Sequence, residues 1–424
     1  MSEVSIPTNE SKRIESLDVL RGFALLGILL LNIIGFGMLS PAYSNPGFDL
    51  AGASSVNIGA WMTVELFAEG AMRCLFSILF GAGVILFTDT KSGWSHYKRT
   101  FWLLMFGLLD AYILLWSGDI LVAYALAGAL LFLVRNHSAK SLMAFSASLI
   151  VLMSLLHAAT GFGLGEAYQA HERVFLAEQN AEPVTQPDLE AAAGWKDFIK
   201  DYTRSEQDLL KETTVRTANY RSAFEWNAEK NTQNYLFALP IFLFWDALAM
   251  MMLGMALYKT GVLQGARDSS FYLKLMLAGF SAGLLINGYE VSRAVQSQFD
   301  IFSTFAQMQP TYHFGRLAMA FGYIGLVVWI CKTGSSFFTN RLAAVGKMAL
   351  TNYLMQSLIC ALIFTGMGFG LLGQLQRIEL YGVVIAIWLF QLWFSTFWLN
   401  RYRFGPVEWL WRTLTYGSAP PISR

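Results

Sequence analysis

Two charged residues in an apolar stretch have the chemistry and the spacing of a functional pair. Arg99 precedes, and Asp110 interrupts, a run of hydrophobic residues that reaches Trp116. Eleven positions are about three turns of an α-helix, so both side chains lie on nearly the same face, about 16 Å apart along its axis. A carboxyl group at that depth in a membrane costs on the order of 2.5–3.5 kcal/mol. We therefore expect Asp110 to face a partner or a watery cavity, either as a buried ion pair or as a proton-transfer group.

The first apolar stretch carries a second set of polar residues. Asp18 and Arg21 are three positions apart and can pair on one helix face, and Asn32 follows Arg21 by eleven positions on nearly the same face. This face is a candidate binding surface. The alternative is an Asp near the helix start and an Arg that reaches back to the cytoplasmic interface.

Glu69 and Arg73 form a charge pair at the start of the second apolar stretch. They are four positions apart and share a helix face. Either Glu69 neutralises Arg73, or Arg73 is the counter-charge of Asp110. The spacing does not decide between these two pairings.

Other polar candidates are spread over the remaining apolar stretches. Asp119 follows a tight Ser-Gly turn, where capping of the next helix explains an Asp well. Asp246 lies in the sixth stretch and Arg316 near the outer start of the eighth. Asn352 and Gln356 share a face in the ninth stretch, either to hold a ligand or to bond to a neighbouring helix.

The composition is that of a membrane protein. The chain has 424 residues, of which 55% are hydrophobic and only 14% charged, with a mean hydropathy of +0.44. A soluble domain has about 25% charged residues. The net charge of +1 gives no reason to expect nucleic-acid binding. Cys74, Cys331 and Cys360 lie in apolar stretches without ligand spacing, so we expect neither a disulfide nor a metal site.

We expect an all-α polytopic bundle of about ten transmembrane helices, each about 20 apolar residues long. No proline falls in the middle of an apolar stretch, so we expect no broken helices from proline. The alternative is unwinding at the glycine-rich stretches that begin at Gly81 and Gly366. The predicted spans are 18–39, 66–88, 100–117, 119–135, 140–160, 235–258, 271–290, 311–332, 342–368 and 378–399.

Basic residues gather in every second connection, and the positive-inside rule then places both termini in the cytoplasm. The alternate connections are nearly free of Lys and Arg. The residues that mark the cytoplasmic side are Lys12, Arg13, Lys91, Lys98, Arg99, Arg135, Lys140, Lys259, Arg267, Lys332, Arg341, Arg401, Arg403 and Arg412.

These spans divide the chain into five segments. Residues 1–17 form a cytoplasmic tail, 18–160 the first five helices, 161–234 an extracytoplasmic insert, 235–399 the last five helices, and 400–424 a cytoplasmic helix and tail. The insert holds thirteen acidic and eight basic residues, and its apolar residues recur at helical spacing. It is either a lid over the outer mouth or a solvated spacer. Pro406 and Gly417 bound a short amphipathic helix suited to the membrane interface.

Five segments together resemble the YeiB-like family of bacterial inner-membrane proteins, a family of unknown function. They span nearly the whole chain, and the last two are the most specific. They begin at Ser16, Leu75, Gly118, Gly346 and Phe404 and read SLDVLRGFALLGI, LFSILFGAG, GDIL, GKMALTNYLMQS and FGPVEWLWRTLTYG. The resemblance implies a location in the bacterial inner membrane.

That family is in turn similar to the transmembrane acyltransferase superfamily. Its members carry an acyl group from a cytoplasmic donor, such as acyl-CoA, to a sugar or lipid acceptor on the far side. Their signature is Arg, ten residues, then His, with the His proposed as the base. Arg99 matches the Arg, and Asp110 stands where the His is expected. An Asp can accept a proton from a hydroxyl group, or its presence means that acyl transfer is altered or lost.

The leading hypothesis is therefore acyl transfer within a polar cavity of the bundle. Arg99 and Arg21 would meet donor phosphates, Asp110 would act as base or would orient the substrate, and Asn352 with Gln356 would hold polar atoms. Acyl-CoA is then a co-substrate, and no covalently bound cofactor is expected.

Two other hypotheses use the same residues differently. A transporter of a small metabolite or ion would use Asp110, Glu69 and Arg73 as a charge relay. A non-catalytic membrane scaffold would contain the same charges only as structural pairs. The sequence does not indicate an oligomeric state.

Overall fold

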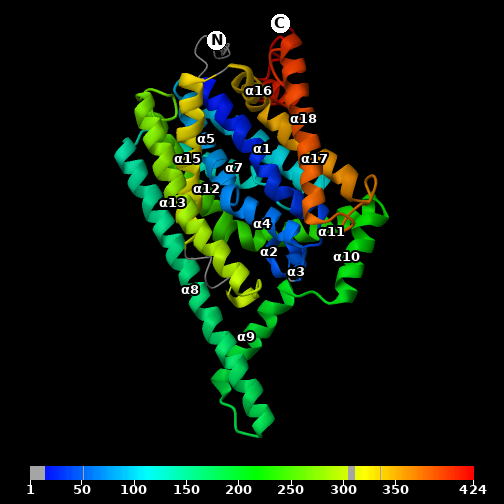
Figure 1. Ribbon diagram of the computed structural model, residues 1–424. Helices are drawn as coiled ribbons and strands as arrows, with labels where there is room; N and C mark the ends of the chain where they lie inside the picture. The colour runs from blue at the N-terminus through cyan, green and yellow to red at the C-terminus, as the bar shows by residue number, and fades with distance from the viewer. Residues whose placement is uncertain (1–14, 51, 304–310, 335) are drawn as a thin grey trace.

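The computed structural model describes residues 15–50, 52–303, 311–334 and 336–424. Lys12 and Arg13, which the orientation argument used, lie outside these residues. The described chain is helical and contains no strand beyond one isolated bridge between Tyr402 and Ser423. This confirms the predicted all-α class. Figure 1 shows a helical bundle in which the start of α1 and the C-terminus lie at one end.

The first half of the bundle contains α1 (Glu15–Gly37), α2 (Pro41–Ser44), α3 (Gly47–Leu50), α4 (Ser55–Phe67), α5 (Ala71–Thr88), α6 (Gly93–Leu108), the π-helix η2 (Leu109–Ile113), α7 (Leu121–Val134) and α8 (Ala139–Asn180). The second half contains α9 (Gln186–Tyr202), α10 (Glu206–Ala218), α11 (Tyr220–Gln233), the π-helix η3 (Asn234–Leu243), α12 (Phe244–Lys259), α13 (Ser269–Gln296), α15 (Tyr312–Thr333), α16 (Ser336–Lys347), α17 (Ala349–Phe364), α18 (Arg377–Arg401) and α19 (Pro406–Tyr416).

Seven helical stretches in the described chain are long and apolar enough to cross a membrane, and an eighth is bent. This makes the chain a membrane protein and accounts for eight of the predicted spans. The bent pair is α16 with α17, which meet at 79°. This bend, together with Pro240 inside η3, corrects the expectation of unbroken helices.

The remaining two predicted spans, 100–117 and 119–135, form a shorter hairpin of α6 with η2 and then α7. The chain reverses inside the protein, at Leu115, whose φ of 60° is uncommon for a residue other than glycine. Trp116 at the tip is 2% exposed, and its ring stacks on Phe36 at 3.9 Å between centroids. The tip of the hairpin is therefore buried against α1 in the interior of the bundle.

Glycines allow the central helices to cross closely. A Cβ atom on Gly81 of α5 would lie 1.9 Å from the carbonyl oxygen of Met251, and one on Gly254 of α12 would lie 1.9 Å from that of Ile78. Small residues at a crossing let two backbones touch, as in other membrane bundles. This contact fixes α12, which carries Asp246, against α5, which carries Arg73.

Several of the basic connections meet at one end of the bundle. The Lys259 ammonium group donates to the carbonyl oxygens of Arg135 and His137, at 2.6 and 2.8 Å. Lys332 donates to the Gly265 carbonyl oxygen at 2.8 Å. We call this end, where α19 also lies, the C-terminal end of the bundle (Figure 1).

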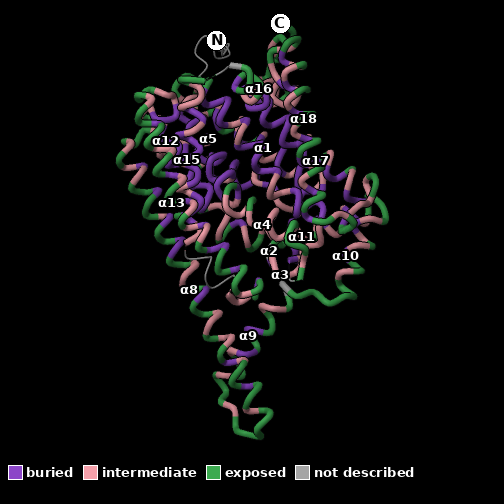
Figure 2. The backbone as a smooth tube through the Cα atoms, in the orientation of Figure 1, coloured by how far each residue is buried: buried purple, intermediate pink, exposed green. Residues whose placement is uncertain are grey.

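The region that the sequence assigns to the insert has two parts. Helix α8 runs without interruption past residue 160 to Asn180, and it projects with α9 beyond the bundle (Figure 1). Figure 2 shows the end of this projection exposed, while buried residues gather in the bundle. Trp195, on the predicted apolar stripe, is buried against Tyr168 of α8. Helices α10 and α11 instead pack against the bundle itself: Arg216 of α10 donates to the Gly35 carbonyl oxygen of α1, and Asn227 of α11 donates to the Ala111 carbonyl oxygen of η2.

Candidate functional site

Asp110 lies in the π-helix η2 and is completely buried. Neither oxygen of its carboxyl group makes a hydrogen bond within the described part of the chain. The polar groups that act on it are Asp119, Ser357 and Tyr353. A π-helix inside an α-helical segment is common at functional sites, and a buried polar group without a partner requires a functional or solvent explanation.

Asp119 lies at the other side of the hairpin tip and is well bonded. Its two oxygens accept the backbone N–H groups of Leu121 (3.1 Å) and Val122 (2.9 Å), so it caps the first turn of α7. The Tyr353 hydroxyl donates to the same carboxyl group at 3.3 Å. Asp119 therefore caps the next helix, as its position after the turn predicted. Its closeness to the carboxyl group of Asp110 was not predicted.

Two carboxyl groups thus lie together in the interior, which we call the carboxyl pair (Asp110 and Asp119). If both were ionised they would repel each other in a medium of low dielectric constant. Such a pair is suited to accept and release a single proton. No arginine or lysine forms an ion pair with either member among the described residues, and Arg73 pairs with Asp246 instead.

Arg73 contacts Asp246, at 3.9 Å between Nε and a carboxyl oxygen. It also donates to the Tyr312 hydroxyl at 2.9 Å, which in turn donates to Glu69 at 3.3 Å. Glu69 therefore reaches Arg73 only through a tyrosine. Neither predicted pairing is present as a direct ion pair among the described residues, because the carboxylate partner of Arg73 is Asp246.

Asp246 is the acceptor at the centre of a buried charge cluster. Arg316 donates two hydrogen bonds to it, one of them at 2.9 Å. Arg316 also contacts His313 Nδ1 at 2.5 Å, and His313 Nε2 lies 2.9 Å from His157 Nδ1 on α8. Asp246 was expected in a membrane helix, but its partner Arg316 could not be predicted from local spacing.

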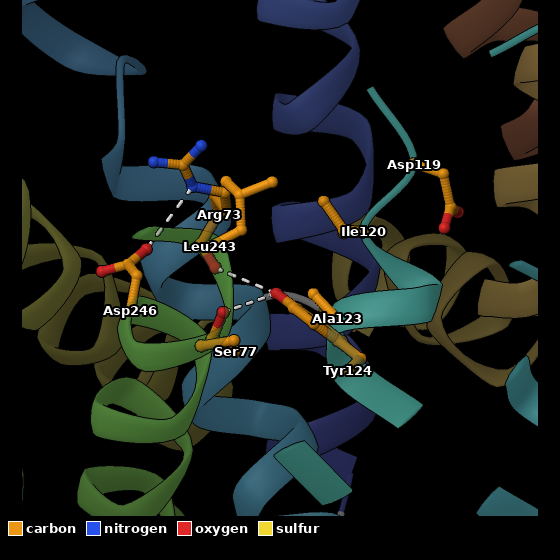
Figure 3. Close-up of a pocket in the computed structure, with 9 residues that line it drawn as sticks. Arg73, Ser77, Asp119, Ile120, Ala123, Tyr124, Leu243 and Asp246 are labelled. Atoms are coloured by element: carbon orange, nitrogen blue, oxygen red, sulfur yellow. Dashed lines mark hydrogen bonds and ion pairs between the residues drawn. The ribbon is translucent and has the colours of Figure 1, made fainter. Parts of the chain in front are cut away.

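A small cavity joins the two groups of charges. It is lined by Asp119 on one side and by Arg73 and Asp246 on the other, with Tyr124 between them (Figure 3). The Tyr124 hydroxyl lies 2.5 Å from the Ser77 hydroxyl. The cavity volume is about 20 Å³, which is enough for a water molecule in polar surroundings. Asp119, the member of the carboxyl pair that lines this cavity, is therefore within reach of water and faces the Arg73–Asp246 pair across it.

Arg99 lies at the C-terminal end of the bundle, between two aromatic rings. Its guanidinium group is 4.3 Å from the Trp411 ring centroid and 4.6 Å from that of Phe87. The Trp411 indole N–H donates to the Arg99 carbonyl oxygen at 2.8 Å. The positive charges that act on Arg99 are those of Arg412 and Arg21. Converging cations of this kind suit a phosphate group.

The other predicted site residues have mainly structural contacts. Arg21 pairs with Asp18 at 3.2 Å, as its spacing predicted, and Asn32 is half-buried in α1. The Asn352 amide donates to Ser395 at 2.9 Å, and the Gln356 amide donates to Gln391 at 3.0 Å. Both amide N–H groups therefore join α17 to α18. Of all the predicted residues, only Asp119 is brought against Asp110.

The C-terminal helix holds the start of α17, the helix that carries Tyr353 and Ser357. Glu408 accepts the backbone N–H groups of Leu350 (2.7 Å) and Thr351 (3.0 Å) and the Thr351 hydroxyl (2.5 Å). Burial raises the pKa of Glu408 above its ordinary value, although these hydrogen bonds oppose the rise. A carboxylate at the N-terminus of a helix satisfies unpaired N–H groups and the helix dipole. This contact explains how the bend at Met348 persists without proline.

We expect Glu408→Gln to lower the free energy of unfolding by about 1–2 kcal/mol. Both carboxylate oxygens of Glu408 accept hydrogen bonds, whereas the glutamine amide has only one oxygen that can accept. The measurement is thermal unfolding in detergent. Glu379→Gln is the matched control, since Glu379 caps α18 through the Gln376 N–H at 2.7 Å in an exposed position. Equal losses in the two variants would contradict a special role for the α19–α17 contact.

The fold and the buried charges define a helical membrane protein with an internal carboxyl pair. The chain is 32% identical over 411 residues to the uncharacterized protein YeiB of Escherichia coli (strain K12), covering 96% of this chain and 97% of that one. It is 31% identical over 430 residues to the uncharacterized protein YxaH of Bacillus subtilis (strain 168), covering 99% and 98%.

Residues 257–418 match a family described as proteins of unknown function, DUF418. The chain therefore belongs to this YeiB-like DUF418 family. No solved structure matches it. Groups of three or more side chains able to hold a metal ion are absent from the described residues.

Proposed function

We propose that this protein transfers an acyl group across the bacterial inner membrane, from a donor such as acyl-CoA to an extracytoplasmic sugar or lipid. The observation that carries the proposal is the unpaired, buried Asp110 beside Asp119, on the chain segment that begins with the cationic site at Arg99. The proposal places both termini, and with them the C-terminal end of the bundle, in the cytoplasm. It builds on the resemblance that Arg99 and the position of Asp110 give to the signature of transmembrane acyltransferases.

The donor would bind at the C-terminal end of the bundle. There Arg99, Arg21 and Arg412 supply positive charge from α6, α1 and α19. Two aromatic rings, Phe87 and Trp411, hold the Arg99 guanidinium in place. Guanidinium groups bind phosphate oxygens strongly because they form charge-assisted hydrogen bonds. The phosphates of acyl-CoA fit this chemistry, and its thioester arm would extend along α6 toward Asp110.

In the reaction, Asp110 would act as the general base. The hydroxyl oxygen of the acceptor attacks the thioester carbonyl carbon while Asp110 takes the hydroxyl proton. The carbon–sulfur bond then breaks, and the thiolate leaves with the proton that Asp110 returns. The products are an ester and a free thiol, so no other reactant is needed. A base without another hydrogen-bond partner is free for this role.

Such a site would be closed in this structure. A cavity of about 20 Å³ admits water but not a thioester. Substrate binding would therefore require helices around η2 to separate, as lids and loops do in many enzymes.

The proposal is tested by acyl-CoA consumption in liposomes containing the protein. We expect Arg99→Gln to raise the KM for the donor about 10- to 100-fold, the loss that follows from removing a charge-assisted hydrogen bond worth about 1.5–3 kcal/mol. The matched control is Arg401→Gln, because Arg401 also stacks on an aromatic ring, Phe397, at 4.1 Å. No consumption of any acyl-CoA by the wild-type protein, or equal KM values in both variants, would contradict the proposal.

A specific observation favours a second candidate, proton-coupled transport of a small metabolite or ion. The cavity is lined by Asp119 of the carboxyl pair and by the Arg73–Asp246 pair, and ionisable groups inside a membrane often mark a proton path. Transport predicts uptake into liposomes that depends on a pH gradient and forms no acyl product. Acyl transfer predicts product without such dependence.

A further inference from the structure

Helix α11 contacts the backbone next to Asp110, although its sequence lies in the predicted extracytoplasmic insert. The side-chain amides of Asn227 and Asn231 both donate to the carbonyl oxygen of Ala111, at 2.5 and 2.7 Å. Asn227 is 3% exposed, whereas Asn231 and Ala111 are completely buried. Two amides from one helix thus converge on the residue that follows Asp110.

The local backbone explains why the Ala111 carbonyl needs these donors. In the π-helix η2, the N–H of Leu114 donates to Leu109, and the N–H of Trp116 donates to Asp110. Neither N–H group therefore serves Ala111, and the chain reverses at Leu115 directly afterwards. A buried carbonyl group without a donor is strongly unfavourable. The asparagine amides supply the donors that a regular α-helix would provide itself.

Neighbouring groups extend this contact along the hairpin tip. The Tyr220 hydroxyl donates to the Ile113 carbonyl oxygen at 3.1 Å. The Asn234 amide donates to the Ser117 carbonyl oxygen, also at 3.1 Å. Three carbonyl groups between Asp110 and Asp119 are therefore held by side chains of α11 and η3. The insert thus holds the turn that separates the two members of the carboxyl pair.

We infer that Asn227 and Asn231 are positioning residues for Asp110. By holding the Ala111 carbonyl, they keep η2 in its π-helical form and keep the Asp110 carboxyl group beside Asp119. Without them, η2 would relax and the carboxyl group would leave its closed surroundings. This inference relies on the proposed function only for the use of Asp110, because the position of Asp110 can be measured without acyl transfer.

The test is the rate at which dicyclohexylcarbodiimide modifies Asp110 in the full-length protein in lipid nanodiscs. A carboxylic acid adds through its oxygen to the carbodiimide carbon, its proton passes to nitrogen, and the acyl group migrates to give a stable N-acylurea. Fragmentation mass spectrometry separates Asp110 from Asp119. We expect modification of Asp110 to be about tenfold faster in the double variant Asn227→Leu/Asn231→Leu, because local opening becomes easier.

The single variants Asn227→Leu and Asn231→Leu are measured as well, in case the double variant does not fold. Each retains one donor to Ala111, so we expect a smaller increase in the rate of Asp110 modification. The matched control is Asn287→Leu, because the buried Asn287 amide also donates to a backbone carbonyl, that of Leu66, at 3.1 Å. An increase confined to the Asn227 and Asn231 variants supports the inference. An unchanged rate in folded variants, or the same increase in Asn287→Leu, overturns it. Acyl-CoA consumption is recorded separately, so failure of the proposed reaction leaves this result interpretable.

Discussion

Asp110→Asn is expected to lower the rate of acyl transfer about 10²- to 10⁴-fold, the usual contribution of a general base. The amide has nearly the shape of the carboxyl group but cannot take a proton from the acceptor hydroxyl. The measurement is transfer of a labelled acyl group in liposomes containing the variant. Because the Asp110 oxygens make no hydrogen bonds to other described residues, we expect the thermal stability to be retained.

Glu290→Gln is the control for this substitution. Glu290 is a buried carboxyl group of α13 that accepts a hydrogen bond from Thr311, outside the carboxyl pair. We expect its variant to transfer acyl groups at nearly the wild-type rate. If Asp110→Asn retained that rate as well, Asp110 would have no part in the reaction.

Arg316→Leu is expected to destabilise the protein by about 3–5 kcal/mol, because it leaves Asp246 as an incompletely paired buried charge. Arg316 is 1% exposed and forms two hydrogen bonds with Asp246. The free energy of unfolding can be measured by denaturant titration in mixed micelles. We expect Asp246→Leu to destabilise the protein similarly, since it leaves Arg316 and Arg73 without their shared partner.

The double variant Arg316→Leu/Asp246→Leu distinguishes pairing from a general loss of packing. If the two residues stabilise mainly each other, the double variant recovers much of the loss seen in each single variant. Additive losses would show that the charge cluster is held by other contacts, among them those of His313.

Features that are set by residues close together in the chain could be predicted from the sequence. The signals were the hydrophobic stretches, the position of Pro406 and the spacing of charged residues. The all-α class, the C-terminal helix from Pro406 and the Asp18–Arg21 pair are of this kind. Gly417 ends that helix with a φ of 71°, a conformation that favours glycine.

Contacts between distant segments could not be predicted in the same way. Asp246 and Arg316 are 70 positions apart, and Glu408 reaches Thr351 across 57 positions. Hydrogen bonds from side chains to distant backbone groups follow no periodic pattern. The same holds for the hairpin of α6 and α7, whose reversal inside the protein depends on burial of Trp116.

One missed group did leave a signal in the sequence. Asn227 and Asn231 are four positions apart in a polar helix and therefore share a face. A pair of amides with this spacing indicates a face that bonds to polar groups. The Ala111 carbonyl oxygen is available as their acceptor because η2 is a π-helix. The spacing of apolar residues does not reveal this π-helix.

The most direct measurement of the central claim compares labelled acyl transfer by three proteins in the same liposomes: wild type, Asp110→His and Asp110→Asn. We predict that His, the base expected in the related signature, retains transfer within about tenfold of wild type, whereas Asn loses at least about a hundredfold. Equal transfer by all three proteins, or no transfer by the wild type with any acyl-CoA, would show that Asp110 is not the base of an acyl transfer.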